Sequence, residues 1–222
     1  MAADNLIDGR AIAEQIHQET AHRVAALKQR GVQPGLVFVR VGDDPASKVY
    51  VGMKEKTSAR LGIDSKTHVL PETTTEGQLL ELISRLNADA SVHGILVQAP
   101  LPRHISETRV YATVSPQKDV DGFHPMNVGK LMLGDTSGFL PCTPAGVHQL
   151  LIRSMIKTVG AEVVVLGRGN IVGKPMAAIL CVDLDSKLNV NSHGSLDLAD
   201  LLDDTVSPTS AVDVLAGPSR YA

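Results

Sequence analysis

Short β-branched apolar runs alternate with longer amphipathic segments along this chain, and that alternation limits the folds open to it. The run GLVFVRVG at 35–42 begins and ends with glycine and is typical of a buried parallel strand. Residues 11–29 before it and 46–61 after it have the apolar spacing of helices. The pattern then repeats as a strand, a helix with a threonine cap, and a strand: 65–70, 74–89 and 92–100. Such alternation predicts an α/β fold with a parallel sheet.

The second half of the chain predicts another α/β unit. Residues 103–142 carry Pro, Gly and Asp at turn positions, so we expect loops between two lobes there. A helix, a strand and a helix are expected next: 144–155, 161–167 and 171–180. Weaker patterns follow for a strand, a helix and a strand: 187–190, 195–204 and 210–217. We therefore expect two domains, residues 1–140 and residues 141–222.

Composition excludes several classes of partner. The 222 residues have a formal net charge of −3 with mixed signs, which leaves no basic stripe for nucleic acid or anionic lipid. Cys142 and Cys181 have no metal-type spacing, and the eight histidines include no His-x-x-x-His pair, so we expect neither a metal site nor a disulfide. The N-terminus lacks the apolar run of a signal peptide, and no segment is apolar enough to span a bilayer. We expect a cytoplasmic protein with small-molecule partners.

A glycine-rich segment follows the second-half strand. Gly167, Gly169 and Gly173 stand between the strand and a helix, where backbone amides and a helix N-terminus can face a phosphate. Arg168 adds a cation of the type that accommodates the 2′-phosphate of NADP. The spacing is one residue longer than the usual dinucleotide fingerprint, so a tight turn that needs glycine for conformation alone is an equal alternative.

Polar residues in the first half form a second constellation. Ser47, Tyr50 and Lys54 share one helix face, where a tyrosine can stack on a flat ring and a lysine can transfer a proton. Gln98 ends a predicted strand, where ligands of open α/β sheets bind. The residues also have an explanation without function: the helix face is an ordinary exposed surface, and Gln98 is a polar residue at a strand end.

Two aspartates lie in the stretch DVDGFHP. Asp119 and Asp121 are either turn-forming carboxylates or a clamp for a heterocycle rich in N–H groups. From the residues alone, turn formation is the default.

Several stretches together resemble the bifunctional methylenetetrahydrofolate dehydrogenase/cyclohydrolase family. In chain order they are IDGRAIAEQI, VGDDPASKVYVGMKEK, HGILVQAPLP, KDVDGFHPMNVG, PCTPAGV and GRGNIVGKPMA, which span residue 6 to about 180. The resemblance implies a three-layer α/β folate lobe followed by a Rossmann-like, parallel-sheet NADP lobe. A short-chain dehydrogenase, which also uses Tyr-x-x-x-Lys, is excluded because its glycine loop precedes the tyrosine.

The resemblance also implies site residues. Lys54 would be the central catalytic group, Tyr50 would stack on the pterin, Gln98 would tune Lys54 and Asp121 would hold pterin nitrogens. The implied substrate-binding positions are Ser47, Tyr50, Gln98, Pro100, Leu101 and Asp121. The implied cofactor-binding positions are Gly167, Arg168, Gly169, Ile171, Gly173, Ser192 and His193.

The implied function belongs to one-carbon metabolism and purine biosynthesis. Hydride would pass from 5,10-methylenetetrahydrofolate to NADP+, and water would then open the 5,10-methenyl cation to 10-formyltetrahydrofolate, within a homodimer. Gly169 replaces the serine of the family motif, which weakens the preference for NADP and leaves NAD possible. The chain ends at Ala222, before a Pro-Gly-Gly-Val-Gly-Pro stretch of the family, so we expect a shortened or divergent nucleotide lobe. The alternative is a folate-binding or cyclohydrolase-only remnant without competent NADP binding.

Overall fold

The computed structural model describes residues 6–182 and the backbone of residues 214–217. The chain divides into two compact units. One comprises Arg10–Pro125, and the other joins Met1–Gly9 to Met126–Ala222. The boundary at Pro125–Met126 lies inside the expected interlobe region, 103–142. Residues of that region therefore belong partly to one unit and partly to the other.

A three-stranded parallel sheet forms the centre of the Arg10–Pro125 unit. Its order is β2-β1-β3, in which β1 (Gly35–Val41) pairs with both β2 (Asp64–Leu70) and β3 (Gly94–Val97). The ladder between β1 and β2 runs in register from the pair Gly35↔Asp64 to the pair Val41↔Leu70. The predicted parallel sheet is confirmed here, with each strand within a few residues of its expected bounds.

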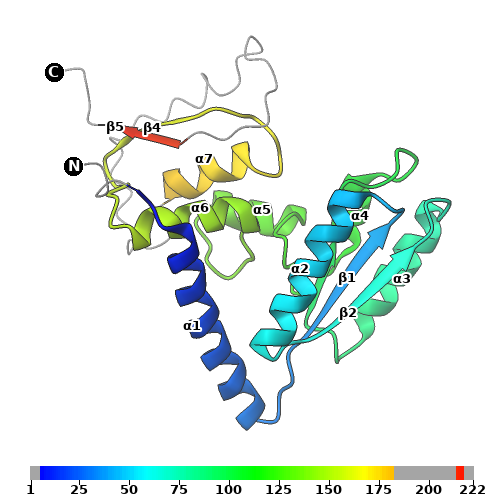
Figure 1. Ribbon diagram of the computed structural model, residues 1–222. Helices are drawn as coiled ribbons and strands as arrows, with labels where there is room; N and C mark the ends of the chain where they lie inside the picture. The colour runs from blue at the N-terminus through cyan, green and yellow to red at the C-terminus, as the bar shows by residue number, and fades with distance from the viewer. Residues whose placement is uncertain (1–5, 183–213, 218–222) are drawn as a thin grey trace. The chain divides into compact units, whose positions relative to one another are not determined.

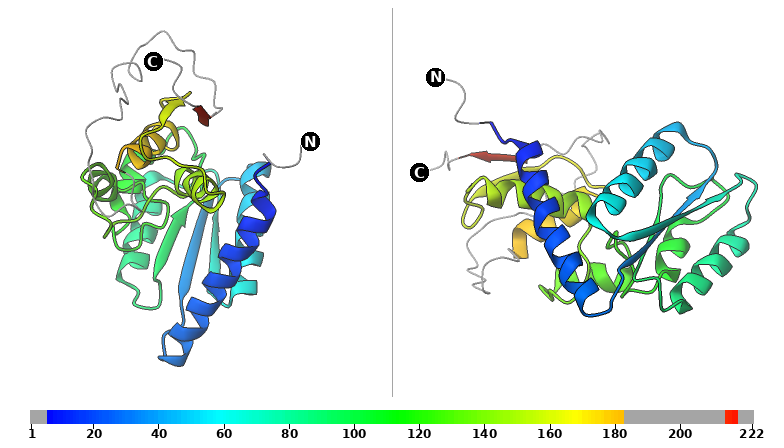
Figure 2. Two further views of the ribbon diagram at one scale, coloured as in Figure 1. Left: turned by 90° about the vertical axis from the view of Figure 1, so that its left-hand side faces the viewer. Right: turned by 60° about the horizontal axis from the view of Figure 1, so that its bottom comes forward.

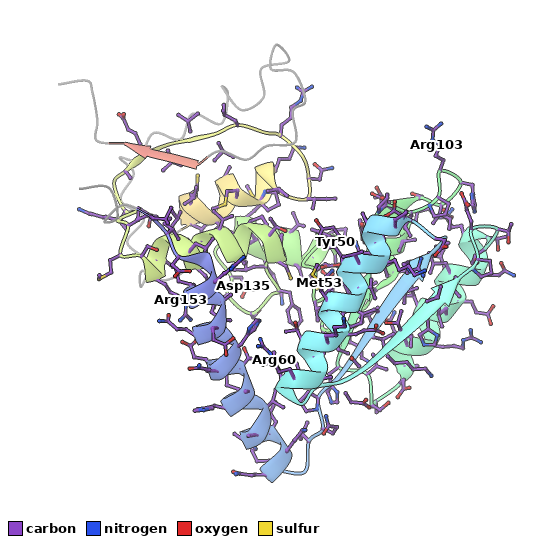
Figure 3. All side chains as sticks on the ribbon, viewed as in Figure 1. Tyr50, Met53, Arg60, Arg103, Asp135 and Arg153 are labelled. Atoms are coloured by element: carbon purple, nitrogen blue, oxygen red, sulfur yellow. The ribbon has the colours of Figure 1, made fainter. Side chains whose placement is uncertain are left out.

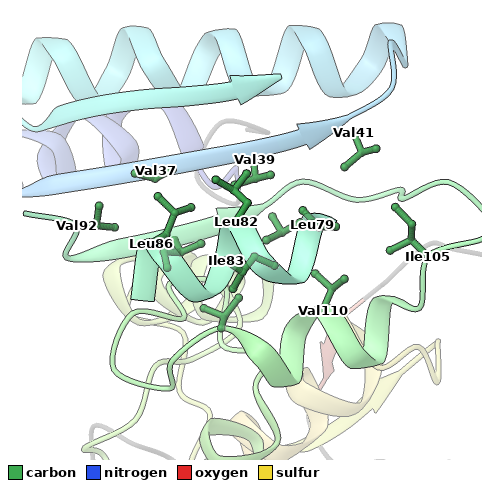
Figure 4. Packing of buried hydrophobic residues seen from close by; sticks show 13 residues of the cluster. Val37, Val39, Val41, Leu79, Leu82, Ile83, Leu86, Val92, Ile105 and Val110 are labelled. Atoms are coloured by element: carbon green, nitrogen blue, oxygen red, sulfur yellow. The ribbon is translucent and has the colours of Figure 1, made fainter. Parts of the chain in front are cut away.

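Alternate residues of β1 face opposite layers of the unit. Val37, Val39 and Val41 belong to the main core cluster with the apolar faces of α3 (Glu76–Ala88) and α4 (Glu107–Thr113), as Figure 4 shows. Phe38, between them, packs with Val51 of α2 (Pro45–Leu61) on the other face. This alternation is the period of two expected for a pleated strand. Figures 1 and 2 show the strands between α2 and α3, the layered order predicted from the sequence.

Local signals explain where the first helices begin and end. Helix α1 (Gly9–Gln29) precedes the sheet. Asp44 caps α2 by accepting a hydrogen bond from the Ser47 amide, and Gly62 ends that helix in a left-handed conformation at φ 78°. Thr75 and Gln78 form a reciprocal capping box at the start of α3. The threonine cap expected from the sequence is therefore confirmed.

Two helices occupy the region that the sequence predicts as loops. Helix α4 is capped by Ser106, whose hydroxyl accepts from the Arg109 amide, and α5 (Pro125–Met132) buries Asn127 and Leu131. The expectation of loops in the interlobe region 103–142 is therefore wrong at these two helices. Each spans only about two turns, which is too short for an apolar repeat to stand out among prolines and glycines.

The other unit is smaller in its described part. Its helices α6 (Cys142–Arg153) and α7 (Gly173–Val182) pack together, and Val165 of β4 (Glu162–Val165) joins their core with Met176 and Ile179 of α7. The sequence places each of these elements to within a few residues.

Strand β5 (Val214–Gly217) runs antiparallel to β4 and lies within the predicted strand at 210–217. The pairs Glu162↔Gly217 and Val165↔Val214 establish the opposite directions of the two strands. This pair differs from the parallel sheet expected for the nucleotide lobe, since the direction of a strand depends on the path of the connecting chain. The elements expected at 187–190 and 195–204 lie outside the described residues.

Candidate active site

Lys54 and Gln98 meet although 44 residues separate them in the chain. Lys54 is half-buried on α2, and its Nζ donates to Gln98 Oε1 at 3.1 Å. The Gln98 amide nitrogen Nε2 donates to the Ala99 carbonyl at 2.6 Å, which leaves Oε1 directed at the lysine. The backbone of Gln98 also continues the ladder of β3, since its N–H donates to Val39 O at 2.8 Å. The strand end therefore holds an acceptor for the lysine in a defined orientation.

Ser47 and Tyr50 take different positions on the same helix. Ser47 is buried, and its hydroxyl donates to the Ala99 carbonyl at 3.3 Å, so it connects α2 to the end of β3. Tyr50 is 55% exposed and is labelled with Met53 on α2 in Figure 3. A ring this open is accessible for stacking on a flat ligand, whereas Ser47 is engaged in joining structural elements.

Pro100 and Leu101 follow directly after this cluster. The peptide bond between Ala99 and Pro100 is cis, and Pro100 is exposed. Leu101 packs against the main core cluster, and its N–H donates to Glu107 Oε1 of α4 at 3.3 Å. Leu101 thus contributes to packing as well as lying next to the site.

The two aspartates of the DVDGFHP stretch have separate roles. Asp119 is buried, forms a bridge with Ile95, and accepts a hydrogen bond from the His124 amide on its Oδ2 at 2.8 Å. Asp119 therefore shapes the turn, as the sequence-based default suggests. These turn contacts involve Asp119 and not Asp121. Asp121 is therefore the better candidate for holding a ligand.

Electrostatics place the Asp121 carboxyl in the same environment as Lys54. Burial raises the pKa of Asp121 to about 6, the Lys54 cation opposes that rise, and the Asp119 carboxylate adds to it. A carboxyl group with this pKa changes its ionisation just below neutral pH. Strong perturbation by burial and by a specific charged neighbour is typical of functional sites.

Tyr111 is a neighbour of the site that sequence reasoning missed. Its ring packs on Phe123 with centroids 5.1 Å apart, and its hydroxyl is buried without a hydrogen-bond partner among the described residues. Burial raises the pKa of Tyr111, and the carboxylates of Glu107, Asp121 and Asp119 raise it further, so the phenol stays protonated. The residue lies in α4, which the sequence did not predict, and no local motif marked it.

The glycines of the loop in the second unit can be needed for the conformation of the turn or for access of a phosphate, and the structure distinguishes these two explanations. Gly167 has φ 144°, and a Cβ on Gly173 would lie 2.2 Å from the Gly167 carbonyl oxygen, so both are needed for the turn itself. A Cβ on Gly169 would meet nothing within 4 Å. Arg168 and Ile171 are exposed. The turn alone thus explains two glycines, whereas Gly169 leaves open space at the loop surface.

Two expected cofactor-binding residues lie outside the described part of the chain, and within that part there is neither a cluster of metal-ligating side chains nor a membrane-spanning helix. Ser192 and His193 lie outside the described residues. Within residues 6–182 and 214–217, no group of three His, Cys, Asp or Glu side chains is placed to hold a metal ion. Cys142 and Cys181 are exposed thiols. No helix in the described part of the chain has the length and apolar character needed to cross a membrane.

Comparison with known families and proteins assigns the chain. Residues 7–121 match the tetrahydrofolate dehydrogenase/cyclohydrolase catalytic domain, and residues 141–206 match the NAD(P)-binding domain of the same proteins. The chain belongs to the tetrahydrofolate dehydrogenase/cyclohydrolase family. The resemblance inferred from the sequence is thereby confirmed, as are its α/β fold and its two kinds of domain.

Individual relatives show how much of the family protein the chain represents. It is 55% identical over 195 residues to the bifunctional protein FolD of Anaeromyxobacter dehalogenans, covering 88% of this chain and 69% of that protein. The FolD crystal structure from Campylobacter jejuni has 47% identity and a TM-score of 0.79, with 80% of this chain and 63% of that chain covered. The Trypanosoma brucei enzyme, solved with NADP cofactor and inhibitor, has 38% identity and a TM-score of 0.76, covering 88% and 67%. The chain thus spans 63–69% of these relatives' lengths.

Proposed function

We propose that this chain oxidises 5,10-methylenetetrahydrofolate with NADP+ and hydrolyses the resulting 5,10-methenyl cation to 10-formyltetrahydrofolate. The observation that carries the proposal is the hydrogen bond from Lys54 to Gln98 beside the perturbed Asp121, all within the segment that matches the catalytic domain. The match of residues 141–206 to the NAD(P)-binding domain supports the cofactor. NADP is the expected cofactor, and NAD is a second candidate.

The folate would be held by groups from both sides of the Lys54–Gln98 pair. Asp121 supplies a carboxylate that accepts from N–H groups of the pterin, and the exposed Tyr50 ring supplies a stacking surface. Pro100 and Leu101 would flank the ligand at the strand end. These roles rest on the family resemblance together with the positions of the side chains.

Lys54 is the proposed proton-transfer group. Its amine is oriented by Gln98, so it can hold or release a proton at Nζ while water adds to the methenyl carbon and the ring opens. In the dehydrogenase step, bound NADP+ would accept the hydride from the bridging methylene carbon. The chain's own contribution to that step is to align the substrate and exclude competing orientations.

The geometry of the described loop supports the proposal of a dinucleotide site. The turn at Gly167 and Gly173 leads into α7, and the open space at Gly169 leaves the loop accessible to a phosphate-bearing ligand. Arg168, exposed within this loop, would meet the 2′-phosphate, and Ile171 would contact the cofactor. Ser192 and His193 would complete the site.

Two separate assays on the purified chain test this proposal. Dehydrogenase activity is followed as reduction of NADP+ and of NAD+ with 5,10-methylenetetrahydrofolate, and cyclohydrolase activity as loss of the absorbance of the methenyl cation. We expect both activities, with NADP+ preferred. Cyclohydrolase turnover without cofactor reduction would instead identify a cyclohydrolase-only protein, and absence of both activities and of folate binding would overturn the proposal.

We further propose that residues 1–140 act as the folate domain and residues 141–222 as the nucleotide domain. The support is the gap between the two family matches, which end at 121 and resume at 141. The homodimer, which the resemblance implies, and the cytoplasmic location, which is expected from the sequence, remain predictions. Sedimentation equilibrium across a concentration series measures the oligomeric state, and a single monomeric species at all concentrations would contradict the dimer.

A further inference from the structure

Lys118 joins the Asp121 loop to the end of a helix. Its Nζ donates to three backbone carbonyl oxygens: Leu86 at 3.1 Å, Asn87 at 2.8 Å and Asp89 at 2.7 Å. These groups lie at the C-terminal end of α3, where carbonyls lack helical partners and the helix dipole favours a cation. All three hydrogen-bonding positions of the ammonium group are therefore occupied by one helix end.

The same residue is also tied to the sheet through its backbone. The Ile95 amide of β3 donates to the Lys118 carbonyl at 2.7 Å, and the Lys118 amide donates to Ser115 O at 2.8 Å. A Cβ on Gly94 would lie 2.6 Å from Val120 Cγ1, so the loop lies directly against the strand. The segment that leads to Asp121 is thus held from α3 and from β3 at once.

A neighbouring side chain strengthens this connection. Asn87 donates from Nδ2 to Thr113 O at 2.7 Å and accepts on Oδ1 from the Ser115 amide at 2.8 Å. The end of α3 therefore also holds the end of α4, from which the chain continues through Ser115 to Lys118. Nothing in the proposed reaction uses Lys118, although it belongs to the sequence motif that contains Asp121.

We propose that Lys118 is a positioning residue: by holding the C-terminal carbonyls of α3, it fixes the loop so that the half-buried Asp121 is presented to the substrate alongside Lys54. The proposal deepens the function proposed above and rests on it. Lys118 itself contacts neither substrate nor cofactor, since its three donors are used.

Loss of the Lys118 contacts should change how deeply Asp121 is buried. The charged and titratable groups around Asp121 are Lys54 on α2, Asp119 on the same loop and Tyr111 on α4. Since burial is the main reason that the pKa of Asp121 is raised to about 6, a loosened loop should let it fall toward the ordinary value. Removal of a positive charge cannot by itself produce this fall, because losing a nearby cation raises the pKa of a carboxyl group.

The experiment compares variants of the full chain in the cyclohydrolase assay across pH. Lys118→Met should lower kcat/KM by about 10- to 100-fold through displacement of the carboxylate, and should shift the acidic limb of the profile to lower pH. Lys118→Arg keeps the charge and N–H donors, so its kcat/KM and the position of its acidic limb should be close to those of the wild type. If Lys118→Met melts below the assay temperature, Lys118→Gln, which keeps an amide donor without the charge, takes its place.

Thr75→Ala provides the control, because it removes the cap at the opposite end of the same helix. It should lower the melting temperature without moving the acidic limb. Unchanged kcat/KM in Lys118→Met, or a Thr75→Ala profile that shifts in the same way, would overturn the positioning role while leaving the proposed function intact. A wild-type chain that neither binds folate nor turns it over would overturn both.

Discussion

The two units prepare their candidate sites in different ways. In the Arg10–Pro125 unit, side chains from separate elements are joined by hydrogen bonds, as between Lys54 and Gln98. In the other unit the described loop is shaped by backbone geometry, with Gly167 and Gly173 in close approach. Substitutions in the first should therefore change the chemistry, whereas substitutions in the second should change how much room a ligand has.

The sharpest test of this contrast is Lys54→Met. It removes the proposed proton-transfer group while keeping an unbranched side chain of similar length, so cyclohydrolase kcat should fall by about 10²–10⁴-fold. Folate binding, measured by titration, should change much less. Lys56→Met on the exposed side of α2 is the matched control and should keep full activity. Full cyclohydrolase activity in Lys54→Met would remove Lys54 from the mechanism.

Gly173→Ala tests the second unit. The added Cβ would lie 2.2 Å from the Gly167 carbonyl oxygen, so the loop must shift at a cost of about 1–3 kcal/mol. We expect weaker NADP binding and at least tenfold lower dehydrogenase activity, while the cyclohydrolase rate is unaffected. Calorimetric titration with NADP measures the binding. Gly169→Ala, where the Cβ meets nothing within 4 Å, is the control for the loop shift and should leave the melting temperature unchanged. Equal losses of both activities would show that the two sites do not behave separately.

Asp121→Asn tests the ionisation expected at the folate site. Because the pKa of Asp121 is raised to about 6 by burial, activity that needs the carboxylate should fall as pH drops through that value. The asparagine variant should lose about 10- to 100-fold in kcat/KM at pH 8, as expected for a charged hydrogen bond, and should lack this acidic limb. A limb that persists unchanged in the variant would assign it to another group.

The same substitution should have the opposite effect on stability. A folded-state pKa above the ordinary value means that the folded protein binds the proton more tightly, so stability falls as pH rises from about 4 to about 6. Asp121→Asn should therefore melt at a higher temperature than the wild type at pH 8, by a few degrees, with little difference at pH 4. Thermal melts at both pH values measure the gap, and a lower melting temperature at pH 8 would contradict the burial argument.

Gly169→Ser should have the smallest effect. The side chain has open space, so stability should change by no more than about 0.5 kcal/mol. Its hydroxyl restores the serine of the family motif and should raise the preference for NADP over NAD several-fold, as a single added hydrogen bond would. Ratios of kcat/KM for the two cofactors measure this preference. An unchanged ratio would show that the loop hydroxyl does not read the 2′-phosphate.

Local pattern made much of the fold predictable. The β-branched run of β1, the capping box at Thr75 and the glycine at the end of α2 are signals contained within a few residues. Helices α4 and α5 were not predicted, because about two turns of helix carry too little periodic signal. The antiparallel direction of β5 was not predicted, because the local residue pattern of a strand does not determine its direction in a sheet.

The sequence by itself determined the alternation of strands and helices, the polar face of α2 and the glycine loop, since each depends on neighbours in the chain. Only the tertiary structure decided that Gln98 orients Lys54, and that Asp119 shapes the turn while Asp121 is half-buried near the lysine. It also decided that Lys118 binds the carbonyls at the end of α3. These outcomes depend on burial and on hydrogen bonds between residues distant in sequence. Such terms exist only once the chain has packed, because desolvation and donor geometry are properties of the folded environment.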